Sequence, residues 1–190
     1  MGRVTLSCLL VLGMTLAMVE AQPREEKSAR TLFGRGINHQ DSKWRRMTED
    51  ELRAVVPERA PVVKERIETE LRTASGIIDG NGRYIFGVVI ITAGYEAEGK
   101  YTHFFKTQVP LRVGDLELGA GEYVFGYQRL AADALRVIFY RATDGGMIGA
   151  VRAAVENRRG AIYSFLIEPP IAGRGKIKIG RFGFEYALLE

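Results

Sequence analysis

Residues 122–141 read EYVFGYQRLAADALRVIFYR and hold two runs in which apolar side chains recur at every second position. In the first run Tyr123, Phe125 and Tyr127 share one face of an extended chain. In the second run Leu135, Val137 and Phe139 do the same. Side chains of a β-strand point alternately to opposite faces, so this alternation predicts two strands that each bury one face.

Similar runs continue on both sides of this stretch. Residues 84–92 are continuously apolar and rich in Val and Ile, as in a strand covered on both faces. Turn residues such as Asp79-Gly80-Asn81-Gly82 separate the runs. Further runs with strand composition occupy residues 101–109, 111–113, 116–118, 161–167, 176–179 and 182–188, whereas 148–155 is ambiguous. About eight or nine short strands without crossover helices predict a mainly β protein, either an antiparallel β-sandwich or a small β-barrel.

The first 21 residues have the layout of a secretory signal peptide. Arg3 precedes an apolar run from Leu9 to Val19, and Val19-Glu20-Ala21 supplies the small residues of a cleavage site. The apolar run is shorter than the roughly 20 residues that span a bilayer. We therefore expect residues 1–21 to direct export, to the periplasm or to the extracellular space.

Two further segments precede the predicted β domain of residues 76–190. Residues 22–46 mix charges with Gly and Asn and predict a flexible basic arm, in which Trp44 is the one residue expected to dock on the domain. Residues 47–75 predict a broken amphipathic helical segment. Thr48 and Glu51 have the spacing of a capping box, and four apolar residues then recur at helical spacing, namely Val62, Val63, Ile67 and Leu71.

The net charge of +4 does not indicate a nucleic-acid-binding domain. Residues 22–46 hold seven basic and three acidic residues, so the whole excess lies in the predicted arm, while residues 47–190 are balanced. A nucleic-acid-binding domain would carry a basic face on its fold. The arm reads as a solvated linker, with contact to an anionic envelope surface as the alternative.

Motifs for catalysis, cofactors or metals are not evident. Cys8 lies in the predicted signal peptide, so the mature chain would have no thiol, and His39 and His103 lie far apart in the sequence. Ser164 has no histidine near it in the sequence to take its proton. The mature chain also has no apolar run near 18 residues, which predicts no transmembrane helix. We assign no catalytic, cofactor-binding or metal-binding residue.

Residues 113–123, VGDLELGAGEY, carry a resemblance. The segment is similar to the V-G-[ND]-x-x-L-P-A-G-x-Y stretch of small exported bacterial β-domain proteins of unknown function, with Gly119 where Pro is usual. The resemblance covers about residues 105–155 and implies a β fold and no known activity. In physical terms Gly114 would allow a tight turn, Leu118 would be buried and Tyr123 would start a strand.

These observations favour an exported, non-enzymatic β domain that binds or scaffolds something in the envelope or outside the cell. A lipocalin-like carrier of a small apolar ligand is an alternative, as are an enzyme whose polar residues come from separate strands and a small outer-membrane barrel. If a barrel encloses a ligand, its lining would be aromatic; otherwise the same aromatics fill the core. The candidate ligand-binding residues are Phe105, Tyr123, Phe125, Tyr127, Phe139, Phe165 and Phe184.

Overall fold

The computed structural model describes residues 44–156 and 160–189. The predicted signal peptide and residues 22–43 of the predicted arm lie outside the described residues. In chain order the elements are β1 (Trp44–Arg46), α1 (Glu49–Val55), β2 (Arg59–Val62), β3 (Glu65–Asp79), β4 (Tyr84–Ile90), β5 (His103–Thr107), β6 (Leu111–Val113), β7 (Leu116–Leu118), β8 (Gly121–Ala131), β9 (Ala134–Arg141), β10 (Met147–Val155), β11 (Tyr163–Ile167), β12 (Arg174–Gly180) and β13 (Phe182–Leu188).

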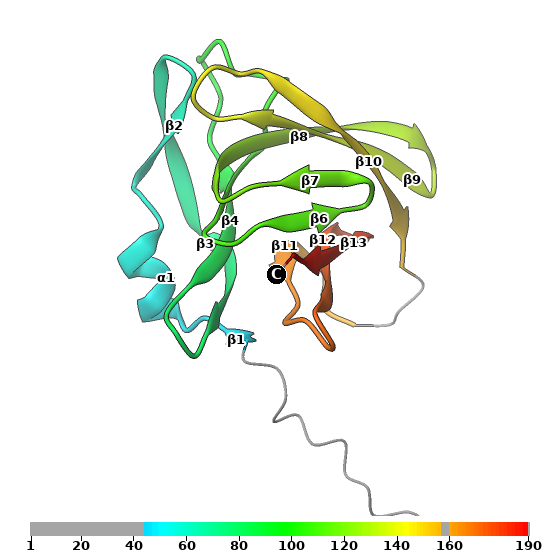
Figure 1. Ribbon diagram of the computed structural model, residues 1–190. Coiled ribbons are helices and arrows are strands. Elements are labelled where there is room, and N and C mark those ends of the chain that lie inside the picture. The colour runs from blue at the N-terminus through cyan, green and yellow to red at the C-terminus, as the bar shows by residue number, and fades with distance from the viewer. Residues whose placement is uncertain (1–43, 157–159, 190) are drawn as a thin grey trace, which may run out of the picture. The chain divides into compact units, whose positions relative to one another are not determined.

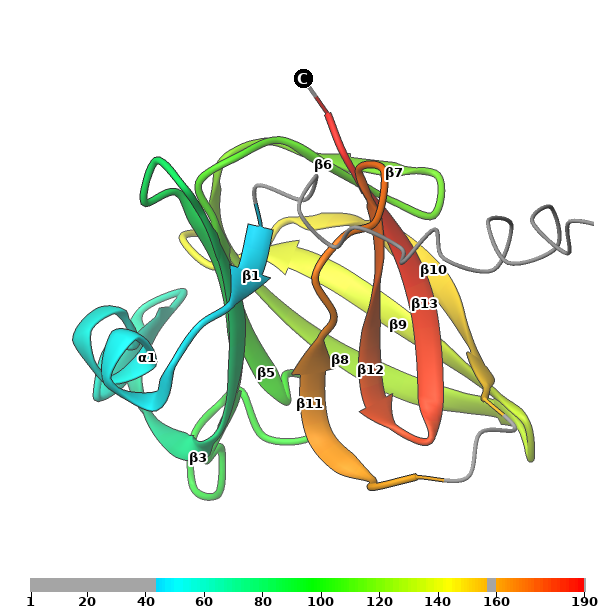
Figure 2. The same ribbon diagram turned by 90° about the horizontal axis from the view of Figure 1, so that it is seen from below.

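The strands form one antiparallel sheet that nearly closes into a barrel, which confirms the mainly β prediction and the barrel alternative (Figures 1 and 2). The sheet order is β1-β3-β4-β5-β8-β9-β10-β13-β12-β11, with β2, β6 and β7 attached to it. The expected count of eight or nine strands is wrong, because the sheet has thirteen. The additional strands include β1, β2 and β3, which lie where the sequence suggested an arm and helices.

The barrel closes where β11 approaches β3 and β4. The backbone N–H of Ile167 in β11 donates a hydrogen bond of 2.9 Å to the Ser75 hydroxyl of β3. Gly87 of β4 lies under the ring of Phe165, and a Cβ atom at Gly87 would come within 2.4 Å of that ring. A side chain at residue 87 would therefore push β11 away, so glycine permits this close approach.

The barrel interior is packed with aromatic and aliphatic side chains. Phe105, Phe125 and Phe139 are fully buried there, each from a different strand. Their rings are tilted or edge-on to one another, with centroids 5.1 Å apart for Phe125 and Phe139 and 6.3 Å apart for Phe105 and Phe139. Offset contacts of this kind are favourable for aromatic pairs. The packing makes the middle of the barrel a solid core.

A second apolar cluster covers the outer face of β3, β4, β5 and β8. Phe86, Val88 and Phe104 point outward from β4 and β5, and Ala60 and Val62 of β2 pack over them. Leu52 and Val55 of α1 lie at the margin of the same cluster. The continuous apolar run of β4 is thereby explained, since Ile85 faces the interior while Phe86 faces this outer layer.

The predicted helical segment over residues 47–75 is mostly wrong. A helix forms only over Glu49–Val55, where Thr48 and Glu51 make the expected capping box. The later apolar residues belong instead to the β2–β3 hairpin, in which Val62 pairs with Glu65. Val62 and Ile67 are buried against β4, whereas Val63 is exposed with a φ of +57° at the turn. The spacing of these apolar residues also fits a helix, but pairing as strands lets them pack on an apolar face of the sheet, and this packing decides the conformation.

The strand β1 ties the end of the predicted arm to the barrel. Trp44 and Arg46 pair with Asp79 and Ile77 of β3, and Trp44 is buried in the interior cluster. Docking of Trp44 on the domain is therefore confirmed. The arm as predicted extends three residues too far, because residues 44–46 form a strand.

The hairpin of β6 and β7 fills the end of the barrel to which β13 runs. Its strand β6 pairs with Leu188–Tyr186 of β13, while β10 pairs with the opposite end of β13, at Phe182 and Gly183. Gly114 turns with a φ of +56°, and Leu118 is buried, as the sequence indicated. Tyr123 lies in β8 and its hydroxyl donates to the Gly119 carbonyl over 2.7 Å. This end of the barrel is therefore filled.

Candidate ligand-binding pocket

A pocket of about 450 Å³ lies at the opposite end of the barrel. It is formed where β4 ends, β5 begins, β8 passes to β9 and β12 turns into β13. The walls include the apolar side chains of Ile90, Leu135, Ile179 and Phe182. The polar lining consists of Thr92, Thr102, His103, Tyr127, Arg129, Ser164 and Arg181. An apolar hollow with a few polar groups is the usual form of a small-molecule site.

His103 is the buried polar group of this pocket. Its side chain is on the inner face of the barrel, at the first residue of β5, and the residue is 3% exposed. The imidazole stacks on Phe125, with ring centroids 4.6 Å apart and planes 9° apart, and Phe165 lies 5.3 Å away. The imidazole is thus fixed in orientation by aromatic contacts from β8 and β11.

The two ring nitrogens of His103 have different surroundings. Nδ1 lies 2.8 Å from the Thr102 hydroxyl, which is in turn 3.2 Å from the Phe125 carbonyl. Nε2 is buried without a hydrogen-bond partner, one of two such side-chain atoms among the described residues; the other is the Tyr101 hydroxyl. Buried polar atoms are normally paired, since leaving one unpaired costs about 1–3 kcal/mol. His103 lines the pocket, and its unpaired Nε2 is closed off from solvent, so a ligand atom would reach it from the pocket with a shift of the neighbouring side chains.

Burial also decides the charge of His103. Desolvation disfavours the imidazolium and lowers its pKa to about 3. The Ser164 backbone acts in the opposite direction as a hydrogen-bonding group, but its contact with the ring lies outside good hydrogen-bond geometry, so it does not pair Nε2. The ring is therefore neutral at physiological pH. A neutral imidazole can accept a hydrogen bond at one nitrogen and donate one from the other. The Thr102 hydroxyl lies within hydrogen-bond distance of both Nδ1 and the Phe125 carbonyl, so its contacts are compatible with either tautomer. Nε2 is a donor in one tautomer and an acceptor in the other.

The contact between Thr102 and His103 resembles a hydroxyl nucleophile beside its base, but its electrostatics do not suit that role. A general base must take up a proton near the working pH. An imidazole with a pKa of about 3 holds that proton poorly at neutral pH. The arrangement is better suited to fixing the orientation of the ring for hydrogen bonding.

Most of the aromatic residues proposed from the sequence lie in the packed core. Six of them belong to the interior cluster, namely Phe105, Tyr123, Phe125, Phe139, Phe165 and Phe184. Tyr127 alone among the seven lines the barrel-end pocket, and it is 44% exposed. The structure therefore brings six of the seven together as core, with Phe125 and Phe165 supporting His103 from below the pocket.

Two polar residues of the pocket, His103 and Arg129, were not among the proposed ligand-binding residues. Both could have been found by extending the alternation in the sequence. Arg129 continues the face of Tyr123, Phe125 and Tyr127 by one step, and His103 has the same parity as Phe105. Polar residues at inward positions near the ends of strands mark the mouth of a barrel.

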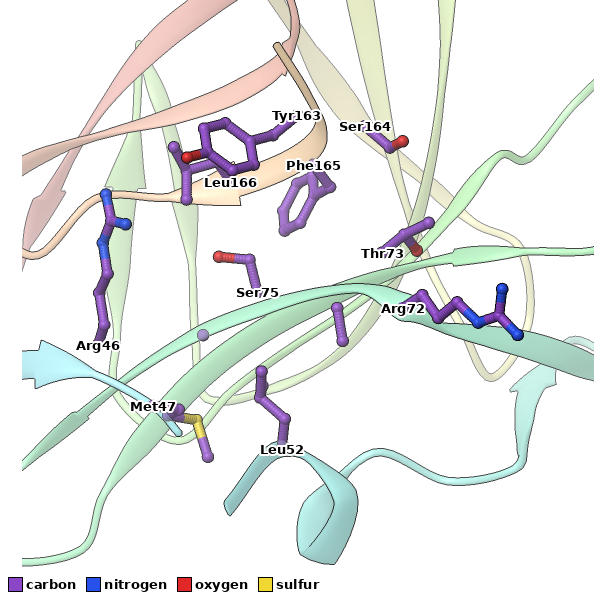
Figure 3. Close-up of a pocket in the computed structure, with 12 residues that line it drawn as sticks. Arg46, Met47, Leu52, Arg72, Thr73, Ser75, Tyr163, Ser164, Phe165 and Leu166 are labelled. Atoms are coloured by element: carbon purple, nitrogen blue, oxygen red, sulfur yellow. The ribbon is translucent and has the colours of Figure 1, made fainter. Parts of the chain in front are cut away.

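Two other hollows are smaller than this pocket. One of about 290 Å³ lies at the β3–β11 junction, between Arg46, Arg72 and Tyr163 (Figure 3). Figure 3 shows the Phe165 ring directed toward β3, while the Ser75 hydroxyl points away from that ring and accepts the Ile167 N–H. The second, of about 170 Å³, lies beside Tyr101 and Lys100. The barrel-end pocket is larger than either and is lined by His103, whose Nε2 has no partner among the described residues.

Comparisons with known proteins found no match to this chain among protein-family models, curated proteins or solved structures. The resemblance of residues 113–123 to small exported β-domain proteins therefore stays a prediction. Within residues 44–156 and 160–189, no helix has the length and apolar character of a membrane span. The same residues contain no group of three or more His, Cys, Asp or Glu side chains arranged to hold a metal ion.

Proposed function

We propose that this protein is an exported, non-enzymatic binding protein that holds a small ligand in the pocket at the open end of its barrel. The ligand would have a mainly apolar body and at least one hydrogen-bonding atom. Export rests on the signal-peptide pattern of residues 1–21, which lie outside the described residues.

The observation that carries this proposal is the unpaired Nε2 of His103 at a pocket of about 450 Å³. A ligand hydroxyl group in contact with Nε2 would satisfy the buried nitrogen in either tautomer, because a hydroxyl both donates and accepts. The apolar body would lie against Leu135, Ile179 and Phe182. Burial of apolar surface contributes roughly 25 cal/mol per Å² of free energy, and the hydrogen bond would set the orientation of the ligand.

Filling the pocket is expected to abolish binding. In Ser164→Trp an indole replaces an exposed hydroxymethyl group at the pocket wall, so it would occupy space that the ligand needs. The probe is N-phenyl-1-naphthylamine, a neutral aromatic amine whose fluorescence rises in apolar sites. We expect the purified protein to bind it and Ser164→Trp to weaken binding by about tenfold or more, a loss of about 1.4 kcal/mol.

The matched control is Tyr163→Trp. Ser164 lines both the barrel-end pocket and the junction hollow of Figure 3, whereas its neighbour Tyr163 lines only the junction hollow and is also exposed. Tyr163→Trp therefore tests the effect of an indole at the junction alone. Binding by Tyr163→Trp should equal that of the unchanged protein. Failure of the unchanged protein to bind the probe, or equal binding by both tryptophan variants, would refute the proposed function.

A further inference from the structure

We infer that the ligand of this pocket is an acid, a small amphiphile whose anionic group lies at the rim against Arg129 and Arg181, separate from the hydroxyl group that reaches Nε2 of His103. This inference rests on the proposed function and adds the charge of the ligand to it. It is carried by the placement of the two arginines, by the groups that surround them and by the composition of the pocket wall.

Arg129 is held at the rim by contacts that leave its charge uncompensated. It lies on β8, two residues beyond Tyr127 on the inward-facing side of the strand. Its guanidinium lies over the Phe182 ring, 5.4 Å from the centroid, and Nη1 donates to the Ala132 carbonyl over 3.3 Å. These contacts orient the group without a carboxylate, so its remaining N–H donors can bind an anion.

Arg181 also lines the pocket, in the turn between β12 and β13. Its backbone carbonyl accepts the Glu156 N–H over 2.9 Å. The Glu156 carboxylate, however, is bound by Lys176 at 2.7 Å and Lys178 at 3.0 Å, and the hydrogen bond from Lys176 is the main cause of its lowered pKa. Glu156 is therefore already neutralised by two lysines. Among the described residues neither Arg129 nor Arg181 forms an ion pair.

Within residues 44–156 and 160–189, the lining of the pocket contains two arginines and no Asp or Glu. Like charges at the mouth of an apolar hollow raise the local concentration of the opposite charge, because low-dielectric walls focus the field. A cationic ligand would be repelled by the same residues. A ligand with a negative group at the rim and an apolar body below it therefore complements the two arginines and the apolar lining of the pocket.

The test compares three ligands with the same ten-carbon chain, namely decanoate, 1-decanol and decylamine, by displacement of N-phenyl-1-naphthylamine at neutral pH. Decanoate should bind about tenfold more tightly than 1-decanol, and decylamine should bind least tightly. In Arg129→Gln/Arg181→Gln, the affinity for decanoate should fall by about tenfold or more. The affinity for 1-decanol should stay within about twofold of its original value, because charge-assisted hydrogen bonds are lost only for the anion.

The control is Arg136→Gln/Arg152→Gln, which removes the same charge. These two arginines are exposed, face each other across β9 and β10, and are not part of the pocket lining. Decanoate binding should be unchanged in this variant. The inference is overturned if both double variants weaken decanoate binding equally, if Arg129→Gln/Arg181→Gln leaves it unchanged, or if decylamine binds best. In each of these outcomes, binding of the neutral probe would still support the proposed function.

Discussion

Acidification from about pH 6.5 to about pH 4.5 is expected to destabilise the protein through His103, with a slope approaching 1.4 kcal/mol per pH unit. Burial lowers the pKa of the folded-state imidazole to about 3, whereas an unfolded histidine has a pKa of about 6.5. The unfolded chain therefore takes up a proton first as the pH falls. The stabilisation is complete above pH ~6.5 and is lost progressively toward the folded-state pKa.

The measurement is urea unfolding at several pH values in this range, for the unchanged protein and for His103→Phe. Phenylalanine keeps an aromatic ring against Phe125 and Phe165 but has no proton to gain. The free energy of unfolding of His103→Phe should depend less on pH, by about 2–3 kcal/mol over the two pH units. Parallel pH profiles for the two proteins would contradict burial of a neutral His103.

Replacement of Phe125 by alanine is expected to lower the free energy of unfolding by about 3–5 kcal/mol. The Phe125 side chain is fully buried, and its ring contacts three others at centroid distances of 4.6 Å for His103, 5.1 Å for Phe139 and 6.0 Å for Phe165. Alanine would leave a cavity among residues from β5, β9 and β11 that cannot all move inward together. Urea unfolding at neutral pH measures the loss.

Phe182→Ala removes the same atoms from a half-buried position at the start of β13. Its effect should be smaller, about 1 kcal/mol, because the site is open to solvent and leaves no closed cavity. Equal losses in the two variants would mean that Phe125 is not at the centre of the packed barrel.

The strands with clear alternation were predictable because apolar residues at every second position indicate both that the chain is extended and which of its faces is buried. The prediction for residues 182–188 matches β13, and the Asp79–Gly82 turn joins β3 to β4 as expected, with Gly82 N–H donating to the Asp79 carbonyl. The β2–β3 hairpin was missed because its apolar residues also fit a helix. Only the outer face of β4, a long-range partner, distinguishes the two alternatives.

The sequence predicted which strands turn side chains into the barrel, but it did not predict most of the residues that line the pocket. The sequence indicated inward aromatic faces, and the structure places most of those aromatics in the core. Whether a barrel interior is full depends on how many strands surround it and on what enters from its ends. His103, Arg129 and Arg181 come from three strands or turns that meet only in the closed sheet, so no linear motif connects them.

Occupation of the barrel end next to His103 is tested most directly by NMR of the imidazole nitrogens during addition of 10-hydroxydecanoate, which has a carboxylate for the rim and a hydroxyl for Nε2. The protein is labelled at histidine, and His103→Phe assigns the resonances by their loss. We expect the His103 Nε2 resonance to shift in a saturable manner as the ligand binds, while the ring stays neutral. Binding of 10-hydroxydecanoate with no change at the His103 ring nitrogens would contradict a ligand site beside His103.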